Sequence, residues 1–376
     1  MTEIYKILNL IAIIQGIFLG LILIFNKKNK YSNRILAVLL FVIAFSMLRW
    51  HFQYIEFFAA YYYMVYINIP FYLLVGPLVY LYTRSITGTL TQFSGRIFYH
   101  FIPFVLFFSF MIFKYHIIDG ARNIEDLKRI SNSSFLGLEF FAFIFLILIM
   151  IYILLSFHLL KKYNKNLKDM FSDIEKLRLL WLNLFLTLAI VFCLILIIAG
   201  VLIVKKLILS SMGYVAGLAI YSIFLISNFA VTYFSIKYPE VFTQEVLISS
   251  KKPYRSFNID ETQGDEYKKI IIKSMEEDKP YLNDSLTLKD FSEMIDLPSH
   301  IVSMTLNVHV NQNFYNFINM YRVEEVKRMF CEKDYKDFTI LRIAFEAGFN
   351  SKTTFNTMFK KFTGNTPSQF RKNSSS

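Results

Sequence analysis

The sequence predicts an all-α protein in two parts, in which seven transmembrane helices precede a smaller soluble helical domain. The chain has 376 residues, of which 55% are hydrophobic and 18% aromatic, and this is too apolar for a soluble protein of this length. The apolar residues gather before position 237 in runs close to the roughly 20 residues that a helix needs to cross a bilayer. After that position the composition changes to charged residues, prolines and short apolar patches at helical spacing.

The membrane part is predicted to extend over residues 1–236. Its apolar segments are residues 4–25, 35–54, 65–83, 97–118, 135–160, 179–204 and 207–236. The boundary between the sixth and seventh segments is the weakest, because only Lys205 and Lys206 separate them. Six crossings and seven crossings would place the C-terminal domain on opposite sides of the membrane, so the charges of the loops must decide.

The positive charges are distributed unevenly between the two sides. Up to residue 236 there are 20 Lys and Arg against 9 Asp and Glu, and after it 20 against 19. The loops after the first, third and fifth segments hold twelve Lys and Arg, and the other side holds six. Because cytoplasmic loops are enriched in Lys and Arg, we expect the N-terminus outside and everything after residue 236 in the cytoplasm.

A group of polar and aromatic side chains lies toward the outer end of the second segment. We name a candidate sensor pocket formed by Arg49, His51, Glu56 and Tyr62. The alternative, which we favour, is that these side chains form a belt at the membrane interface. No pair of carboxylates crosses the bilayer, which argues against a proton-coupled pump.

The sequence offers little for catalysis or metal binding. Cys193 and Cys331 are too few and too far apart for a disulfide framework or a metal cluster. None of the common hydrolase, metalloprotease, nucleotide-binding or kinase motifs is present. We therefore expect no catalytic residues, no metal and no cofactor, and an enzyme is the least favoured class.

The soluble part contains two similar helical patterns. Residues 237–265 have the composition of a linker, and residues 266–376 form the predicted domain. Apolar spacing predicts a first helix-turn-helix at 286–310, a linking helix at 313–331 and a second helix-turn-helix at 339–363. In the second unit Gly348 allows a left-handed turn, and Asn350 or Ser351 begins the next helix.

Three stretches carry a family resemblance, namely FINMYRVEEVKRM, IAFEAGFNS and FKKFTGNTPSQFRK. Together they resemble the DNA-binding domain of AraC-type (AraC/XylS-like) transcription regulators, over about residues 286–372. The resemblance implies that the second helix of each unit enters one of two successive major grooves. Carried over by position, the residues that read bases are His300, Ser303, Met304, Lys352, Thr353, Asn356 and Thr357.

The two units differ in charge. The first recognition helix has no Lys or Arg before Gln312, whereas the second unit carries Lys352, Lys360, Lys361, Arg371 and Lys372 after its last acidic residue. We expect Lys360, Lys361 and Arg371 to contact phosphates. The second unit should therefore supply most of the affinity through counterion release, and the first should add modest selectivity.

The stretches GPLVYLYTRS, HFIPFVLFF and KYPEVF of the front part resemble a group of bacterial multi-pass membrane regulators with this domain. The expected function is a one-component transcription regulator in the bacterial inner membrane, which senses an unknown small-molecule or membrane signal. Expected partners are double-stranded DNA, membrane lipid, a second copy in a homodimer and, as a further candidate, RNA polymerase. The alternative is a membrane receptor or transporter whose C-terminal helices bind a protein and not DNA.

Overall fold

The computed structural model describes residues 2–26, 30–54, 67–90, 94–113, 135–175, 177, 179–204 and 261–374. Within these residues every regular element is a helix, so the predicted all-α class is confirmed. The chain divides into two compact units. Unit 1 comprises Met1–Lys161 and Leu179–Ser250, and unit 2 comprises Lys162–Arg178 and Lys251–Ser376.

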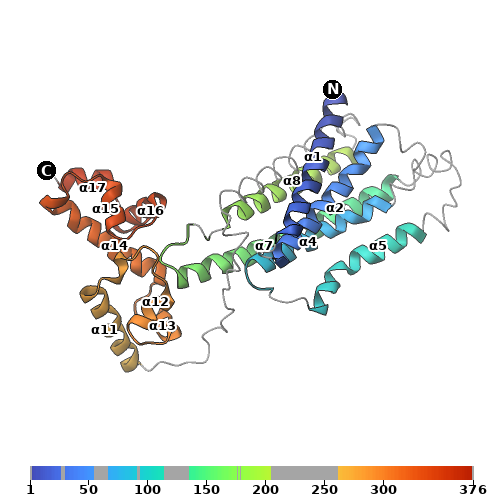
Figure 1. The fold of residues 1–376 in the computed structure, drawn as a ribbon. Coiled ribbons are helices and arrows are strands. Elements are labelled where there is room, and N and C mark those ends of the chain that lie inside the picture. Colours follow the sequence, from blue (N-terminus) through green and yellow to red (C-terminus); the bar gives the residue numbers. More distant parts are fainter. Residues whose placement is uncertain are drawn as a thin grey trace. The chain divides into compact units, whose positions relative to one another are not determined.

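Unit 1 is built of long apolar helices (Figure 1). They are α1 (Thr2–Phe25), α2 (Lys30–Tyr54), η2 (Ile69–Phe71), α4 (Tyr72–Ile86), η3 (Gly95–Phe101), α5 (Ile102–Phe113), α7 (Phe135–Met170) and α8 (Leu180–Val204). In the described residues, six helical stretches are long and apolar enough to cross a membrane. They correspond to the first six predicted segments, and the seventh, 207–236, lies outside the described residues.

Close packing joins α1 to α2, which lie side by side (Figure 1). Ala12 and Ile13 of α1 are buried against Ala44 and Met47 of α2. A Cβ atom on Gly20 would lie 2.6 Å from the ring of Phe41. The glycine therefore allows the two helices to approach, as small residues do in membrane helix pairs.

Helix α4 contacts several neighbours. The hydroxyls of Ser32 and Ser85 are hydrogen-bonded at 2.8 Å, which ties α2 to α4. Gly76 lies against the ring of Tyr152 on α7. Large apolar side chains elsewhere on α1, α5, α7 and α8 are exposed, among them Phe18 and Leu106, as expected of helices that face lipid.

Several boundaries differ from the predicted ones, and two of these differences have a local cause. The fourth segment begins as the 3₁₀ helix η3 and becomes α-helical only at Ile102. Pro103 at the second position explains this start, because proline has no N–H to donate and suits the first turn of a helix. Helix α7 continues ten residues beyond the predicted end at 160, through four lysines, since lysine is a good helix former.

Unit 2 consists of shorter helices (Figure 1). They are α11 (Glu261–Glu277), η5 (Pro280–Leu282), α12 (Leu288–Met294), α13 (Ser299–His309), α14 (Phe314–Cys331), η6 (Lys333–Tyr335), α15 (Ile340–Glu346), α16 (Lys352–Thr363) and α17 (Pro367–Ser374). Helix α11 begins inside the predicted linker 237–265. The linker up to residue 260 lies outside the described residues.

Helix α14 connects the group of α11, α12 and α13 with the group of α15, α16 and α17 (Figure 1). At one end Phe317 and Ile318 pack with α11, α12 and α13 in a cluster that includes Ile271 and Phe291. At the other end Phe330 contacts the rings of Phe359 and Phe370 on α16 and α17. The predicted arrangement of two helical units joined by one long helix is therefore present.

One stretch groups differently from the predicted domains. Residues Lys162–Arg178 lie inside the predicted membrane domain 1–236, but they pack with unit 2. Ser172 is only 1% exposed there. Buried polar side chains in proteins are normally hydrogen-bonded. The hydrogen-bond partners of Ser172 belong to unit 2.

Candidate nucleic-acid interface

The first helix-turn-helix begins with a capping box. The Thr287 hydroxyl accepts a hydrogen bond from the Asp290 N–H at 3.2 Å, and the Asp290 carboxylate accepts one from the Thr287 N–H at 3.2 Å. These two hydrogen bonds provide acceptors for backbone N–H groups at the start of α12, which would otherwise have none. Asp296 then takes a left-handed conformation with φ +50°, which ends α12 and turns the chain toward α13.

Helix α13 presents a narrow accessible face of mixed polarity. Val302 and Leu306 are fully buried. His300 and Met304 are half-buried, and Asn307 and Val308 are exposed. Ser303 is 2% exposed, so its hydroxyl does not lie on the face that DNA could reach. The expectation that Ser303 reads a base therefore needs correction: α11 and α12 both pack on α13 and widen its buried side.

The second helix-turn-helix has the turn that the sequence predicts. Gly348 has φ +88°, in the left-handed region. Of the two candidate N-caps, Ser351 takes the role: its hydroxyl accepts a hydrogen bond from the Thr354 N–H at 3.1 Å. Helix α16 therefore starts at Lys352, directly after a satisfied cap.

The predicted reading residues of α16 share one exposed face. Thr354, Phe355, Met358 and Phe359 are buried against the core. The side chains between them point outward and recur at helical spacing: Lys352, Thr353, Asn356, Thr357, Lys360 and Lys361. The arrangement offers hydrogen-bonding groups at the start of the helix and cations at its end, as a major-groove reader requires.

The cations predicted to contact phosphates are not equivalent. The Lys361 ammonium donates to the Asn316 side-chain oxygen at 2.8 Å, and partial burial, together with the charge of Lys168, lowers its pKa. The Arg371 guanidinium donates to the carbonyls of Tyr335, Lys336 and Phe338. Arg371 thus braces the loop before α15. Lys360 is exposed at the end of α16.

Comparison with known proteins agrees with this geometry. A family model described as a helix-turn-helix domain matches residues 299–373. This part of the chain is an AraC-type helix-turn-helix domain.

The matching relatives are uncharacterized HTH-type transcriptional regulators of Staphylococcus aureus, from strains COL, MSSA476 and N315. Each is 32% identical over 91 residues, which are 24% of this chain and 12% of the relative. The matched part thus spans about an eighth of the relatives' length. No solved structure matches the chain significantly.

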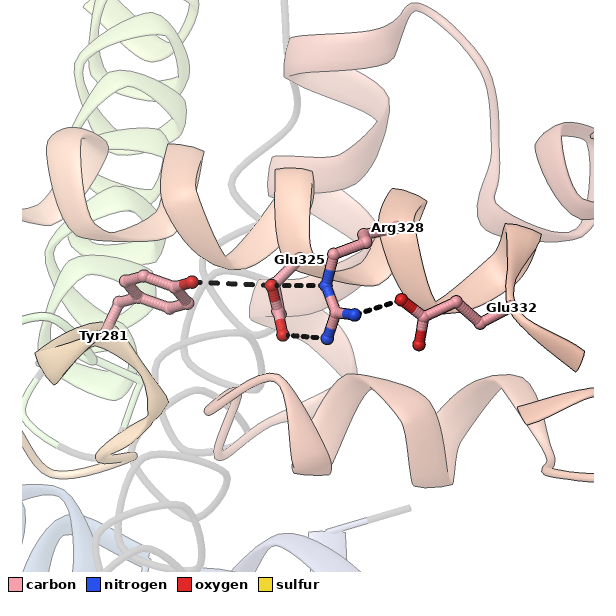
Figure 2. Close-up of polar contacts among 4 residues, drawn as sticks. All are labelled: Tyr281, Glu325, Arg328 and Glu332. Atoms are coloured by element: carbon pink, nitrogen blue, oxygen red, sulfur yellow. Dashed lines mark hydrogen bonds and ion pairs between the residues drawn. The ribbon is translucent and has the colours of Figure 1, made fainter. Parts of the chain in front are cut away.

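A charged network on α14 braces the AraC-type domain (Figure 2). Arg328 donates to both carboxylate oxygens of Glu325, at 3.1 and 2.6 Å, and also to Glu332. The Tyr281 hydroxyl donates to Glu325 at 3.4 Å. Hydrogen bonds from Arg328 hold the pKa of Glu325 below its usual range, and burial beside Glu325 raises the pKa of Tyr281 to about 12. Glu325 therefore stays charged and Tyr281 stays protonated at neutral pH.

Arg322 is the largest polar side chain in the core of the domain. It is fully buried, and it donates to the carbonyls of Tyr281 and Asn283, each at 2.7 Å. Burial lowers its pKa to about 10, so the guanidinium remains charged at neutral pH. The sequence predicted the helix that carries Arg322 but not this structural role. The only signal for the role in the sequence was a charged residue among apolar neighbours.

The candidate sensor pocket remains a prediction. Arg49 and His51 lie in the last two turns of α2, but the structure describes only their backbone. Glu56 and Tyr62 lie outside the described residues.

Proposed function

We propose that the chain is a membrane-embedded one-component transcription regulator whose AraC-type domain binds DNA sequence-specifically in the cytoplasm. One observation carries the DNA-binding part: α16 exposes Lys352, Thr353, Asn356, Thr357 and Lys360 along a single face. Such a face fits the major groove, where amide and ammonium groups recognise base edges. Helix α13, with His300 and Met304, adds modest selectivity in the next groove.

The membrane part of the proposal rests on the apolar helices and the loop charges. Six stretches of the described residues have the length and composition of membrane spans. We propose that they sense a signal in or outside the membrane and change the pairing or orientation of the DNA-binding domains in a dimer.

The proposed topology predicts where the C-terminus lies. The loops that hold twelve Lys and Arg are expected inside, so a reporter fused after Ser376 should be active only as a cytoplasmic reporter. The paired measurement uses a cytoplasm-active and a periplasm-active reporter at the same position. Activity of the periplasmic one would overturn seven crossings and remove the domain from DNA.

Base readout and phosphate attraction separate by position on α16. Genomic DNA enriched on the full chain in detergent should contain a shared sequence, and competition binding at several salt concentrations then compares variants. Lys360→Ala should weaken binding to all sequences alike and lower the slope of log affinity against log salt by about one unit. Lys352→Ala or Asn356→Ala should change the preferred base, at about 1 to 3 kcal/mol for a good bidentate contact.

The contradicting results are distinct. If Lys360→Ala shifts base preference and Lys352→Ala changes only the salt slope, the assigned roles are reversed. If no shared sequence is enriched, the alternative applies, in which the C-terminal helices bind a protein partner.

A further inference from the structure

The stretch after α7 makes ladder-like contacts with the first helix-turn-helix. Phe171 pairs with Thr287, the N-cap of α12, in an isolated antiparallel bridge. The next residue, Ser172, donates from its N–H and its hydroxyl to the Leu286 carbonyl, at 3.3 and 2.6 Å. Phe171 and Ser172 therefore lie along the segment that leads into α12.

The same stretch is held from its other side by α14. The Ser172 carbonyl accepts from the Asn319 amide at 2.9 Å and from Arg322 at 3.5 Å. Its hydroxyl accepts from Arg322 at 3.2 Å. Asp173 adds a negative charge near Arg322, and Ile174 is buried at 3% exposure.

These contacts show that the stretch is packed into unit 2 and does not lie on its surface. Ser172 is 1% exposed, and Asn319 and Arg322 are fully buried. The groups that hold Ser172 are thus desolvated polar groups. If the stretch left, each would lose part of its hydrogen bonding, although Asn319 would keep the Tyr315 carbonyl and Arg322 those of Tyr281 and Asn283.

We propose that residues 171–174 form a strap that docks onto the AraC-type domain and transmits the state of the membrane helices to it. The proposal rests on the proposed function and names the route of its regulation. The strap is a second attachment, independent of the linker 237–265.

The position of the strap in the chain supports this route. Helix α7 runs without a break from Phe135 to Met170, and α8 begins at Leu180. Both are candidate membrane spans. A shift of either helix end therefore acts on the strap within a few residues. The strap in turn touches the N-cap of α12 and the middle of α14, and these two helices position the recognition helices.

Cysteine cross-linking tests the docking. In a full chain that carries Cys193→Ala and Cys331→Ser, Phe171→Cys is combined with Thr287→Cys, because facing residues of an antiparallel pair lie within reach of a disulfide. The matched control combines Phe171→Cys with Glu293→Cys, an exposed position on the same helix. Peptide mass spectrometry of the monomer band should find the first disulfide and little of the second. Equal yields, or none in the first pair, would overturn the docking.

A larger side chain at position 172 tests whether the strap transmits the state of the membrane helices. Ser172→Trp cannot fit the buried site, so it should abolish the cross-link and change output from an enriched promoter at least about fivefold at equal protein level. Ser172→Ala removes only the hydroxyl and should act in the same direction with a smaller effect. Lys165→Trp, at an exposed position on α7, should change neither.

The outcomes separate the two proposals. Loss of the cross-link with unchanged promoter output would overturn transmission through the strap. If the full chain enriches no DNA, the proposed function fails, while the disulfide still reports whether the strap is docked.

Discussion

Replacing Gly348 by valine is expected to unfold the second helix-turn-helix. Two effects add at this position. The backbone φ of +88° strains any residue with a Cβ, and a β-branched one most. A Cβ would also lie 2.2 Å from the Tyr281 carbonyl oxygen and 2.9 Å from the backbone of Leu282. Strain and overpacking each cost about 1 to 3 kcal/mol, so several kcal/mol are expected together.

Gly364 provides the matched control for this variant. It has a similar φ of +76°, but nothing lies within 4 Å of its Cβ position. Gly364→Val should therefore show the backbone strain alone. Hydrogen exchange of the α15 and α16 amides in the full chain in detergent measures both variants. Equal loss of protection in the two would show that the contact with Tyr281 contributes nothing.

Arg322→Met is expected to destabilise the domain by on the order of 3 kcal/mol or more. Methionine fills much of the same volume, but it leaves the buried Tyr281 carbonyl without its donor. It also removes the hydrogen bonds of the guanidinium to the Ser172 carbonyl and hydroxyl, whereas the Asn283 carbonyl still accepts from the Leu286 N–H at 3.3 Å. Each buried acceptor left unpaired costs about 1 to 3 kcal/mol. Arg322→Lys should recover only part of the loss, because an ammonium cannot reproduce the planar fork.

Arg342→Met is the control for Arg322→Met. Arg342 is 59% exposed and pairs with Glu346 at 3.9 Å, and its guanidinium lies 3.6 Å from the centre of the Phe338 ring. Exposed ion pairs and exposed cation–π contacts each contribute up to about 1 kcal/mol, so its replacement should cost less than that of Arg322. Hydrogen exchange of α14 amides compares the two. If the α14 amides exchange as slowly in Arg322→Met as in the parent protein, the buried guanidinium does not stabilise the domain.

Local patterns predicted most of the domain. Gly348 and Ser351 were found from the sequence because a left-handed turn and an N-cap favour few residue types. The outward residues of α16 were assigned by position from the family resemblance, and the structure places them on one exposed face. The apolar runs likewise located the six described helical stretches that are long and apolar enough to cross a membrane.

The remaining features depend on contacts between distant parts of the chain. Ser303 was expected on a recognition face, but its burial depends on how α11 and α12 pack on α13. Arg371 was assigned to phosphate, and its contacts with carbonyls of the loop at 335–338 arise only once α17 folds back. The docking of residues 171–174 could not be foreseen, because nearly 150 residues separate Ser172 from Arg322.

The contact of Gly348 with the backbone at Tyr281 and Leu282 has a consequence for the DNA. Gly348 belongs to the second helix-turn-helix, whereas Tyr281 packs in the core of the first. The relative orientation of the two helix-turn-helix units is therefore fixed by main-chain contact as well as by α14. Under the proposed function, an operator for this domain must keep a fixed number of base pairs between its two half-sites, because the contact at Gly348 and helix α14 hold the two units together within residues 261–374.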